Sequence, residues 1–205
     1  LMGYETLFCH VDVKDPEYEV QLHEILSDTE SVIVLLGTEM LEEDFEPYTC
    51  ARNRLILLDG WSNRYSFDGV LISNTDSAAR AVEYLADKGH TEIGYIRGDF
   101  RIQAFQYREI GYKRVMEARG LRVRPEYIAT VGTKVDTAYE GMREYLACAE
   151  QMPTAFFADN DIIAIGAMRA LKESGYDIPG DVSIVGFDNV SFGALVEPAL
   201  TTIHV

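Results

Sequence analysis

Charged and polar side chains, together with one indole, follow most of the short apolar runs in this sequence. They belong to Asp59, Trp61, Ser73, Asn74, Asp76, Arg101, Arg108, Lys134, Asp136, Asp159, Asn160, Asp161, Asp188 and Asn189. Carboxylates and amides share hydrogen bonds with hydroxyl groups, arginine donates a fork of N–H groups, and an indole stacks on the apolar face of a sugar. The set therefore predicts a site for a neutral polyhydroxyl ligand. Asp and Asn at these positions would also cap the following helices, and both interpretations stay open.

The sequence lacks the common signatures of enzymes. It contains no GxxxxGK[ST] phosphate loop and no GxGxxG, GxSxG or HExxH motif. The four histidines, His10, His23, His90 and His204, do not have the spacing of metal ligands. A ring of Asp and Arg could form an active site, but no activated nucleophile or catalytic base accompanies it. We therefore expect no catalytic residue, no cofactor and no metal.

The composition limits the partners of this chain. Of 205 residues, 18 are Lys or Arg and 34 are Asp or Glu, which gives a formal charge of −16. This charge repels phosphate backbones and anionic lipids, so we expect the chain to bind neither nucleic acid nor membranes. No apolar run reaches the length of about 18 residues that a transmembrane helix needs. The three scattered cysteines (Cys9, Cys50 and Cys148) and the lack of a signal peptide favour the cytoplasm.

Apolar runs alternate with helical patterns along most of the chain. Strands are expected at residues 6–11, 31–36, 55–58, 69–72, 92–96, 127–131, 154–157 and 182–187, and helices at 75–88, 103–119, 137–150 and 160–174. The run Val32–Leu36 is apolar at every position, which is typical of a parallel strand buried on both faces. The alternation predicts a doubly wound α/β fold with parallel sheets.

The pattern restarts after a helix stop at Lys88-Gly89-His90, which predicts two α/β subdomains. We place the first at residues 1–89 and the second at residues 90–200, with a hinge near Gly89-His90. Residues 61–68 are expected to form a loop. The acidic stretch at residues 42–46 is interpreted as a solvated face rather than a site.

Three groups of residues then resemble one known family. They are the string DIPGDVSIVGFDN at 177–189 with PALTTI at 198–203, Asn160-Asp161 followed by the helix at 164–171, and Gly89-His90, Ile93-Gly94, Gly98, Arg108 and Gly111-Tyr112. Together they resemble the effector-binding domain of the LacI/GalR family of bacterial transcription regulators. The resemblance covers nearly the whole chain, and the string near the carboxyl end is its most specific part.

The resemblance implies a type I periplasmic-binding-protein-like fold, in which two Rossmann-like subdomains close on a small ligand, usually a sugar. Carried over to this sequence, the family's ligand-binding positions are Asp59, Asp76, Arg108, Asn160 and Asp188. The family often has Asp-Asn where this chain has Ser73-Asn74, so a direct ligand role there is not expected. The family also often has an aromatic near Lys134. Residues 132–136 offer none, so Trp61 or a phenylalanine would take that part. Phe100 and Phe105 are the candidates, and both fit a place in the core as well.

The resemblance also implies a longer protein that acts as a ligand-responsive regulator. A first strand and a helix-turn-helix that binds operator DNA would precede Leu1, and residues 201–205 would begin a return crossover to the first subdomain. The protein would be a homodimer, with Met168, Leu171, Lys172, Phe192 and Leu195 at the interface. Part of the helix that carries Leu171 would instead belong to the internal core. The alternative is a sugar-binding protein of an ABC transporter, which shares the fold. The PALTTI string and the missing signal peptide favour the regulator.

Overall fold

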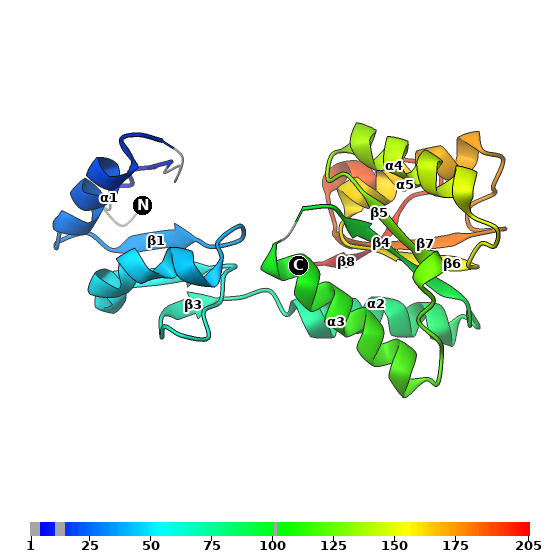
Figure 1. Ribbon diagram of the computed structural model, residues 1–205, viewed down its shortest axis with the longest axis horizontal. Helices are drawn as coiled ribbons and strands as arrows, with labels where there is room; N and C mark the ends of the chain where they lie inside the picture. The colour runs from blue at the N-terminus through cyan, green and yellow to red at the C-terminus, as the bar shows by residue number, and fades with distance from the viewer. Residues whose placement is uncertain (1–4, 11–14, 101) are drawn as a thin grey trace. The chain divides into compact units, whose positions relative to one another are not determined.

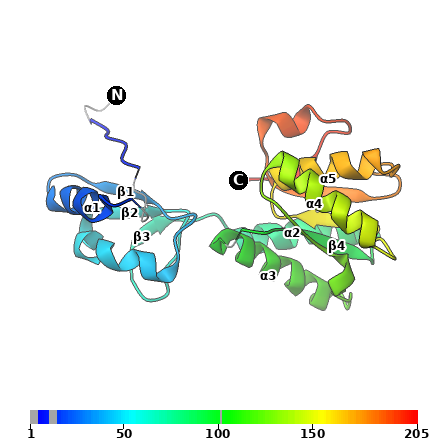
Figure 2. The same cartoon turned by 45° about the horizontal axis from the view of Figure 1, so that its top comes forward.

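The structure is a computed structural model that describes residues 5–10, 15–100 and 102–205. The chain divides into two compact units, Leu1–Leu71 and Ile72–Val205. Figures 1 and 2 show the elements of each unit. Among the residues described, no helix combines the length and apolar character needed to cross a membrane.

The first unit is a three-stranded parallel sheet with helices packed on one face. Its elements are α1 (Tyr18–Ser27), β1 (Ile33–Leu36), the 3-10 segment η1 (Glu42–Arg54), β2 (Leu55–Leu58) and β3 (Asp68–Val70), with strand order β1-β2-β3. Leu22 of α1 and Phe45 of η1 pack against Leu55 and Leu57 of β2. Successive strand residues point to opposite faces, so only every second residue of β1 and β2 reaches this core.

The other face of this sheet is exposed in the described structure. Val34 is 59%, Leu36 is 67% and Ile56 is 39% exposed. The expectation that Val32–Leu36 is buried on both faces is therefore wrong for this chain. The alternation of the pleat puts Ile33 and Leu35 on the core and leaves their neighbours outside, whatever the hydrophobicity of the run.

The second unit is a five-stranded parallel sheet in the order β5-β4-β6-β7-β8. Its elements are α2 (Asn74–Asp87), β4 (Ile93–Gly98), α3 (Gln103–Ala118), the short segment η2 (Pro125–Tyr127), β5 (Ile128–Val131), α4 (Val135–Cys148), β6 (Ala155–Ala158), α5 (Asp161–Glu173), β7 (Ser183–Asp188), the short segment η3 (Ser191–Ala194) and β8 (Thr201–His204). The predicted α/β fold with parallel sheets is confirmed.

Helices cover both faces of this larger sheet. Figure 1 shows α2 and α3 on one face and α4 and α5 on the other. Val82 of α2 and Tyr112 of α3 pack with Tyr95 and Phe157 of the strands, while Met142 of α4 and Leu171 of α5 belong to the core on the opposite face. Burial on both faces explains why β4, β6 and β7 are apolar at most of their positions.

The division between the units lies earlier than the expected boundary at residue 89. Helix α2 belongs to the second unit because it packs against α3 and the second sheet. The helices approach so closely that a Cβ atom on Gly111 would lie 2.3 Å from the carbonyl oxygen of Thr75. His90, expected near a hinge, bonds to the hydroxyls of Thr154 and Ser183 at the amino ends of β6 and β7.

Most predicted elements have their counterpart in the structure, with three differences. The expected strand at residues 6–11 is not formed by residues 6–10, and Val11 lies outside the described residues. Helix α1 and the 3-10 segment η1 were not expected. Residues 201–204, expected to begin a return crossover, form the edge strand β8, which pairs in parallel with β7.

Candidate functional site

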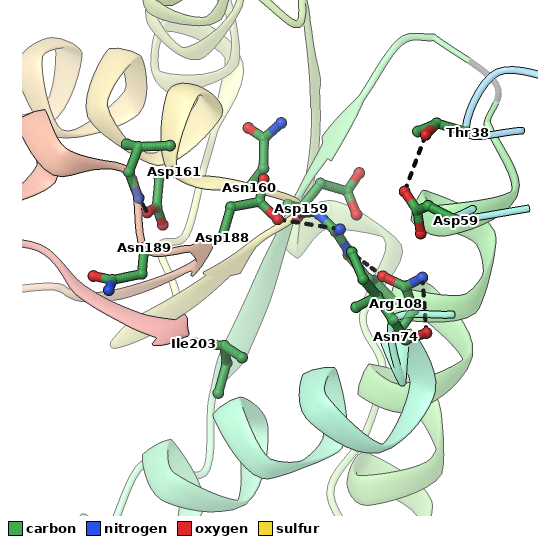
Figure 3. Close-up of polar contacts among 12 residues, drawn as sticks. Thr38, Asp59, Asn74, Arg108, Asp159, Asn160, Asp161, Asp188, Asn189 and Ile203 are labelled. Carbon is green, nitrogen blue, oxygen red and sulfur yellow. Dashed lines mark hydrogen bonds and ion pairs between the residues drawn. The ribbon is translucent and has the colours of Figure 1, made fainter. Parts of the chain in front are cut away.

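The carboxyl edge of the second sheet gathers charged and amide groups from several elements. Arg108 lies on α3, which follows β4; Asp159 and Asn160 follow β6; and Asp188 ends β7. Figure 3 shows Arg108 beside Asp159 and Asp188, which lie at the ends of their strands, with Asn160 close by. Ligands of open α/β sheets bind at this edge, so it is the candidate site of the unit.

Arg108 is a buried cation whose guanidinium is held on several sides. Its Nε donates to Asn74 Oδ1 at 2.9 Å, and one terminal nitrogen donates to the carbonyl oxygen of Asp159 at 2.6 Å. The other terminal nitrogen forms an ion pair with Asp188 Oδ1 at 3.3 Å. The group also stacks on the ring of Phe187, with 3.8 Å between the guanidinium carbon and the ring centroid. These contacts compensate the cost of burying the charge.

Asp188 is the exposed partner of this cation. Its side chain is 31% exposed, against 5% for Arg108. Its φ angle is 104°, and that of the next residue, Asn189, is 57°. Such angles cost about 1–3 kcal/mol in a non-glycine residue and concentrate at functional sites. The strand end therefore presents a carboxylate to solvent beside a fixed guanidinium, an arrangement suited to pairs of hydroxyl or other polar ligand groups.

Two other carboxylates of the predicted set are structural. Asp159 is fully buried and accepts hydrogen bonds from the Tyr95 hydroxyl and from the Gly98 N–H. Burial raises the pKa of its carboxyl to about 7 against the opposing effect of these donors. Asp161 is also fully buried and accepts from Val190 N–H and the Thr202 hydroxyl, which ties the loop after β7 to β8.

Asn160 and Asp76 lie at the amino ends of their helices. Asn160 caps α5, because its Oδ1 accepts the N–H of Ile163 at 2.9 Å. Asp76 is 70% exposed and pairs with Arg114 of α3 at 2.8 Å, a bond that lowers the pKa of its carboxyl. The structure thus pairs Arg108 with Asp188 directly, and gives Asp76 a different arginine.

Asp59 and Trp61 belong to the first unit. Asp59 follows β2 with a φ of 48° and accepts a hydrogen bond from the Thr38 hydroxyl at 3.1 Å (Figure 3). Trp61 is 46% exposed, and its Nε1 donates to Asn63 Oδ1 at 3.1 Å. Both side chains remain accessible, and their ligand role stays a prediction.

Glu42 shapes the loop that carries Trp61. It accepts from the Ser62 hydroxyl at 2.5 Å and from the backbone N–H groups of Asn63 and Arg64 at 3.0 and 2.9 Å. Phe45, in the same acidic stretch, is fully buried. The interpretation of residues 42–46 as a solvated face is therefore wrong for these two residues.

The structure also corrects the expected dimer interface. Leu171 is fully buried and Met168 is 4% exposed, and both belong to the core between α5 and the sheet. An interface cannot use a side chain already enclosed by its own unit, so these two assignments are wrong. Lys172, Phe192 and Leu195 are exposed, with Leu195 at 84%.

Of the aromatic side chains considered as stacking partners for a ligand, Phe100 is half-exposed and Phe105 is buried in the core. Arg101 lies outside the described residues. Sequence reasoning missed the structural roles of Tyr95 and Phe187. A continuously apolar strand gives no signal of which ring will contact a polar group.

Two units with parallel sheets, one carrying an Arg–Asp pair at the carboxyl edge of its strands, define a ligand-binding α/β protein of the periplasmic-binding-protein type. The Periplasmic binding protein-like domain matches residues 82–205. The chain belongs to this family, in the form of the effector-binding domain of LacI/GalR-type regulators.

Curated relatives and solved structures agree with this assignment. The chain is 31% identical to the HTH-type transcriptional repressor PurR of Vibrio vulnificus and 27% identical to that of Actinobacillus pleuropneumoniae, over 98% of this chain and 60% of each relative. It thus spans about 60% of the length of these relatives. A sugar-binding transcriptional regulator of the LacI family from Escherichia coli, complexed with phosphate, superposes with a TM-score of 0.77 at 26% identity, covering 89% of this chain and 65% of that one. A LacI-family regulatory protein from Chloroflexus aggregans superposes with a TM-score of 0.79 at 25% sequence identity. The match covers 91% of this chain and 67% of that one.

Proposed function

We propose that this chain is the ligand-sensing part of a LacI/GalR-type transcription regulator and is not an enzyme. The observation that carries the proposal is the Arg108–Asp188 pair, in which a buried, fixed guanidinium stands beside a half-exposed carboxylate. Polar groups of a ligand would bind this pair, and Asp59, Trp61, Asp76 and Asn160 would supply further contacts.

The proposed effector is a small molecule, with a carbohydrate favoured. A donor fork next to a carboxylate suits vicinal hydroxyl groups, and the net charge of −16 disfavours polyanionic ligands. One LacI-family relative of known structure is described as sugar-binding. Ligand binding would shift the equilibrium between conformations of the chain. The size of this shift is limited by the difference between the ligand's binding free energies for these conformations.

In the complete regulator, operator DNA would be bound by a helix-turn-helix outside this acidic chain, in the cytoplasm. We propose a homodimer that uses the exposed residues Lys172, Phe192 and Leu195. The double variant Phe192→Asp, Leu195→Asp should dissociate the dimer in a sedimentation concentration series. A wild-type protein that stays monomeric throughout the series would contradict the dimer.

A thermal-shift screen of sugars and purines tests the proposed site. A true effector should raise the Tm of the wild type, and Asp188→Ala and Arg108→Ala should abolish that shift. Asp87→Ala is the matched control, because Asp87, the last residue of α2, forms an exposed ion pair with Arg119, which directly follows α3. A shift that survives in both site variants would show that the ligand binds elsewhere.

A further inference from the structure

Asn74 is a buried amide, and both ends of its side chain form hydrogen bonds. Its Oδ1 accepts from Arg108 Nε at 2.9 Å, and its Nδ2 donates to the carbonyl oxygen of Ile72 at 3.4 Å. Its backbone N–H donates to the same carbonyl at 2.8 Å. The residue is 8% exposed. An amide can serve both partners because it carries an acceptor and a donor on one carbon (Figure 3).

The bonded carbonyl lies in the segment that joins the two units. The first unit ends at Leu71 and the second begins at Ile72, and we call residues 71–73 the linker. Asn74 is the first residue of α2, directly after the linker. It therefore connects the guanidinium of the candidate site to the linker through one side chain.

The rest of the first turn of α2 is fastened to the helix that carries Arg108. The Thr75 hydroxyl donates to the carbonyl oxygen of Tyr107 at 3.1 Å. Gly111, one turn beyond Arg108, lies so close to Thr75 that a Cβ atom there would collide with its carbonyl oxygen. The start of α2 cannot move away from Arg108 without breaking these contacts, because packed interiors deform little.

We infer that Asn74 is a positioning residue that holds the Arg108 guanidinium and couples it to the linker. Its Oδ1 fixes the guanidinium beside Asp188, and its N–H groups fix the Ile72 carbonyl. A ligand that displaced Arg108 would thereby change the free energy of linker conformations. The relevance to a ligand rests on the proposed function, whereas the coupling itself is present in the free chain.

NMR measurement of hydrogen exchange without any ligand tests the coupling from both ends. Asn74→Ala should speed exchange of the Arg108 Nε proton by about tenfold, because one buried hydrogen bond is lost. Arg108→Lys should speed exchange of the Asn74 and Ser77 amides, which donate to the carbonyls of Ile72 and Ser73, by a similar factor. Arg114→Gln is the control, because it removes an exposed contact between α3 and the same turn of α2, and it should leave these rates within about twofold.

Asn74→Asp separates the bond that Asn74 makes to Arg108 from the bond that it makes to Ile72. The carboxylate keeps an acceptor for Arg108 but loses the Nδ2 donor to Ile72, which leaves the backbone N–H of residue 74 as the remaining bond from this residue to that carbonyl. The Arg108 Nε proton should therefore stay protected, while the amide of residue 74 should exchange faster. Amides of α4 and α5 serve as an internal reference for general loosening of the unit. Equal linker exchange in Arg108→Lys and Arg114→Gln, or full linker protection in Asn74→Asp, would overturn the coupling. Coupling without any hit in the ligand screen would reject the proposed ligand class and leave the coupling standing.

Discussion

The two sheets carry similar aspartates after their apolar strands, and the surroundings of these aspartates differ. Asp59 has a φ of 48° and Asp188 a φ of 104°. Asp59 is held by the Thr38 hydroxyl, whereas Asp188 faces the buried guanidinium of Arg108. The same local sequence signal therefore marks two kinds of site, one with a neutral partner and one with a fixed cation brought from a distant helix.

The layers around each sheet explain this difference. The second sheet is covered by helices on both faces, so its carboxyl edge has walls that can enclose Arg108, Asp159 and Asp161. The first sheet exposes Val34 and Leu36 on one face. Burial of a charge needs surrounding groups that replace water, and only the second unit supplies them among the residues described.

The largest expected difference in stability between the two sites comes from removing the residue that bonds to each aspartate. Arg108→Ala should lower the free energy of unfolding of the second unit by about 3 kcal/mol, because Asn74 Oδ1 and the Asp159 carbonyl lose a charged donor. Thr38→Ala should cost the first unit less than about 1 kcal/mol. Urea unfolding can follow both, since the single tryptophan, Trp61, reports on the first unit and far-UV circular dichroism reports chiefly on the helices of the second. Equal losses in the free energy of unfolding of the two units would show that the two aspartates do not differ in the strength of their partners.

The buried carboxylate behind Arg108 predicts an unusual pH dependence. The folded-state pKa of Asp159 is raised to about 7 from 3.8, so its stabilising contribution is complete below the unfolded-state value and is lost as the pH rises through 7. Asp159→Asn removes this titration. Its Nδ2 can donate to the Tyr95 oxygen, which in turn lies 3.4 Å from the Phe105 carbonyl.

The variant should therefore gain stability relative to wild type at pH 8. That advantage should shrink by about 2 kcal/mol at pH 5. Free energies of unfolding of both proteins at the two pH values provide the measurement. An advantage that does not change with pH would mean that Asp159 does not titrate in this range.

The smallest expected effect comes from isosteric amides. Asp188→Asn should destabilise the second unit by about 1 kcal/mol, because a charge-assisted contact becomes a neutral one. Asp59→Asn should stay within about 0.5 kcal/mol, since an amide oxygen accepts from Thr38 equally well and Asn tolerates a positive φ. Chemical denaturation at pH 7.5 measures the loss of stability in each variant. A larger loss in Asp59→Asn than in Asp188→Asn would contradict the partners assigned to these aspartates.

Local sequence patterns predicted most helices and strands of this chain. Most wrong predictions concern residues whose contacts lie far away in the sequence. Helices such as α5 and strands such as β2 follow from periodicity within a few residues. The burial of Leu171 depends on its packing in the core between α5 and the sheet, and the pairing of Asp76 with Arg114 depends on the packing of α2 against α3. Arg108 and Asp188 were both predicted as ligand-binding residues, but nothing local indicated that Asn74 would bond to Arg108.

The exposed face of β1 had no sequence signal either. Its apolar residues look alike in the one-dimensional pattern, and only the pleat and the packing of α1 and η1 decide which of them are covered.

Calorimetric titration of the strongest hit from the ligand screen into wild type, Asp188→Asn and Asp87→Ala tests the central claim most directly. If the Arg108–Asp188 pair is the effector site, Asp188→Asn should weaken binding by about 100-fold, as expected when a ligand loses a hydrogen bond to a charged group, and Asp87→Ala should bind like wild type. Equal affinity of Asp188→Asn and wild type would contradict the assignment of the site.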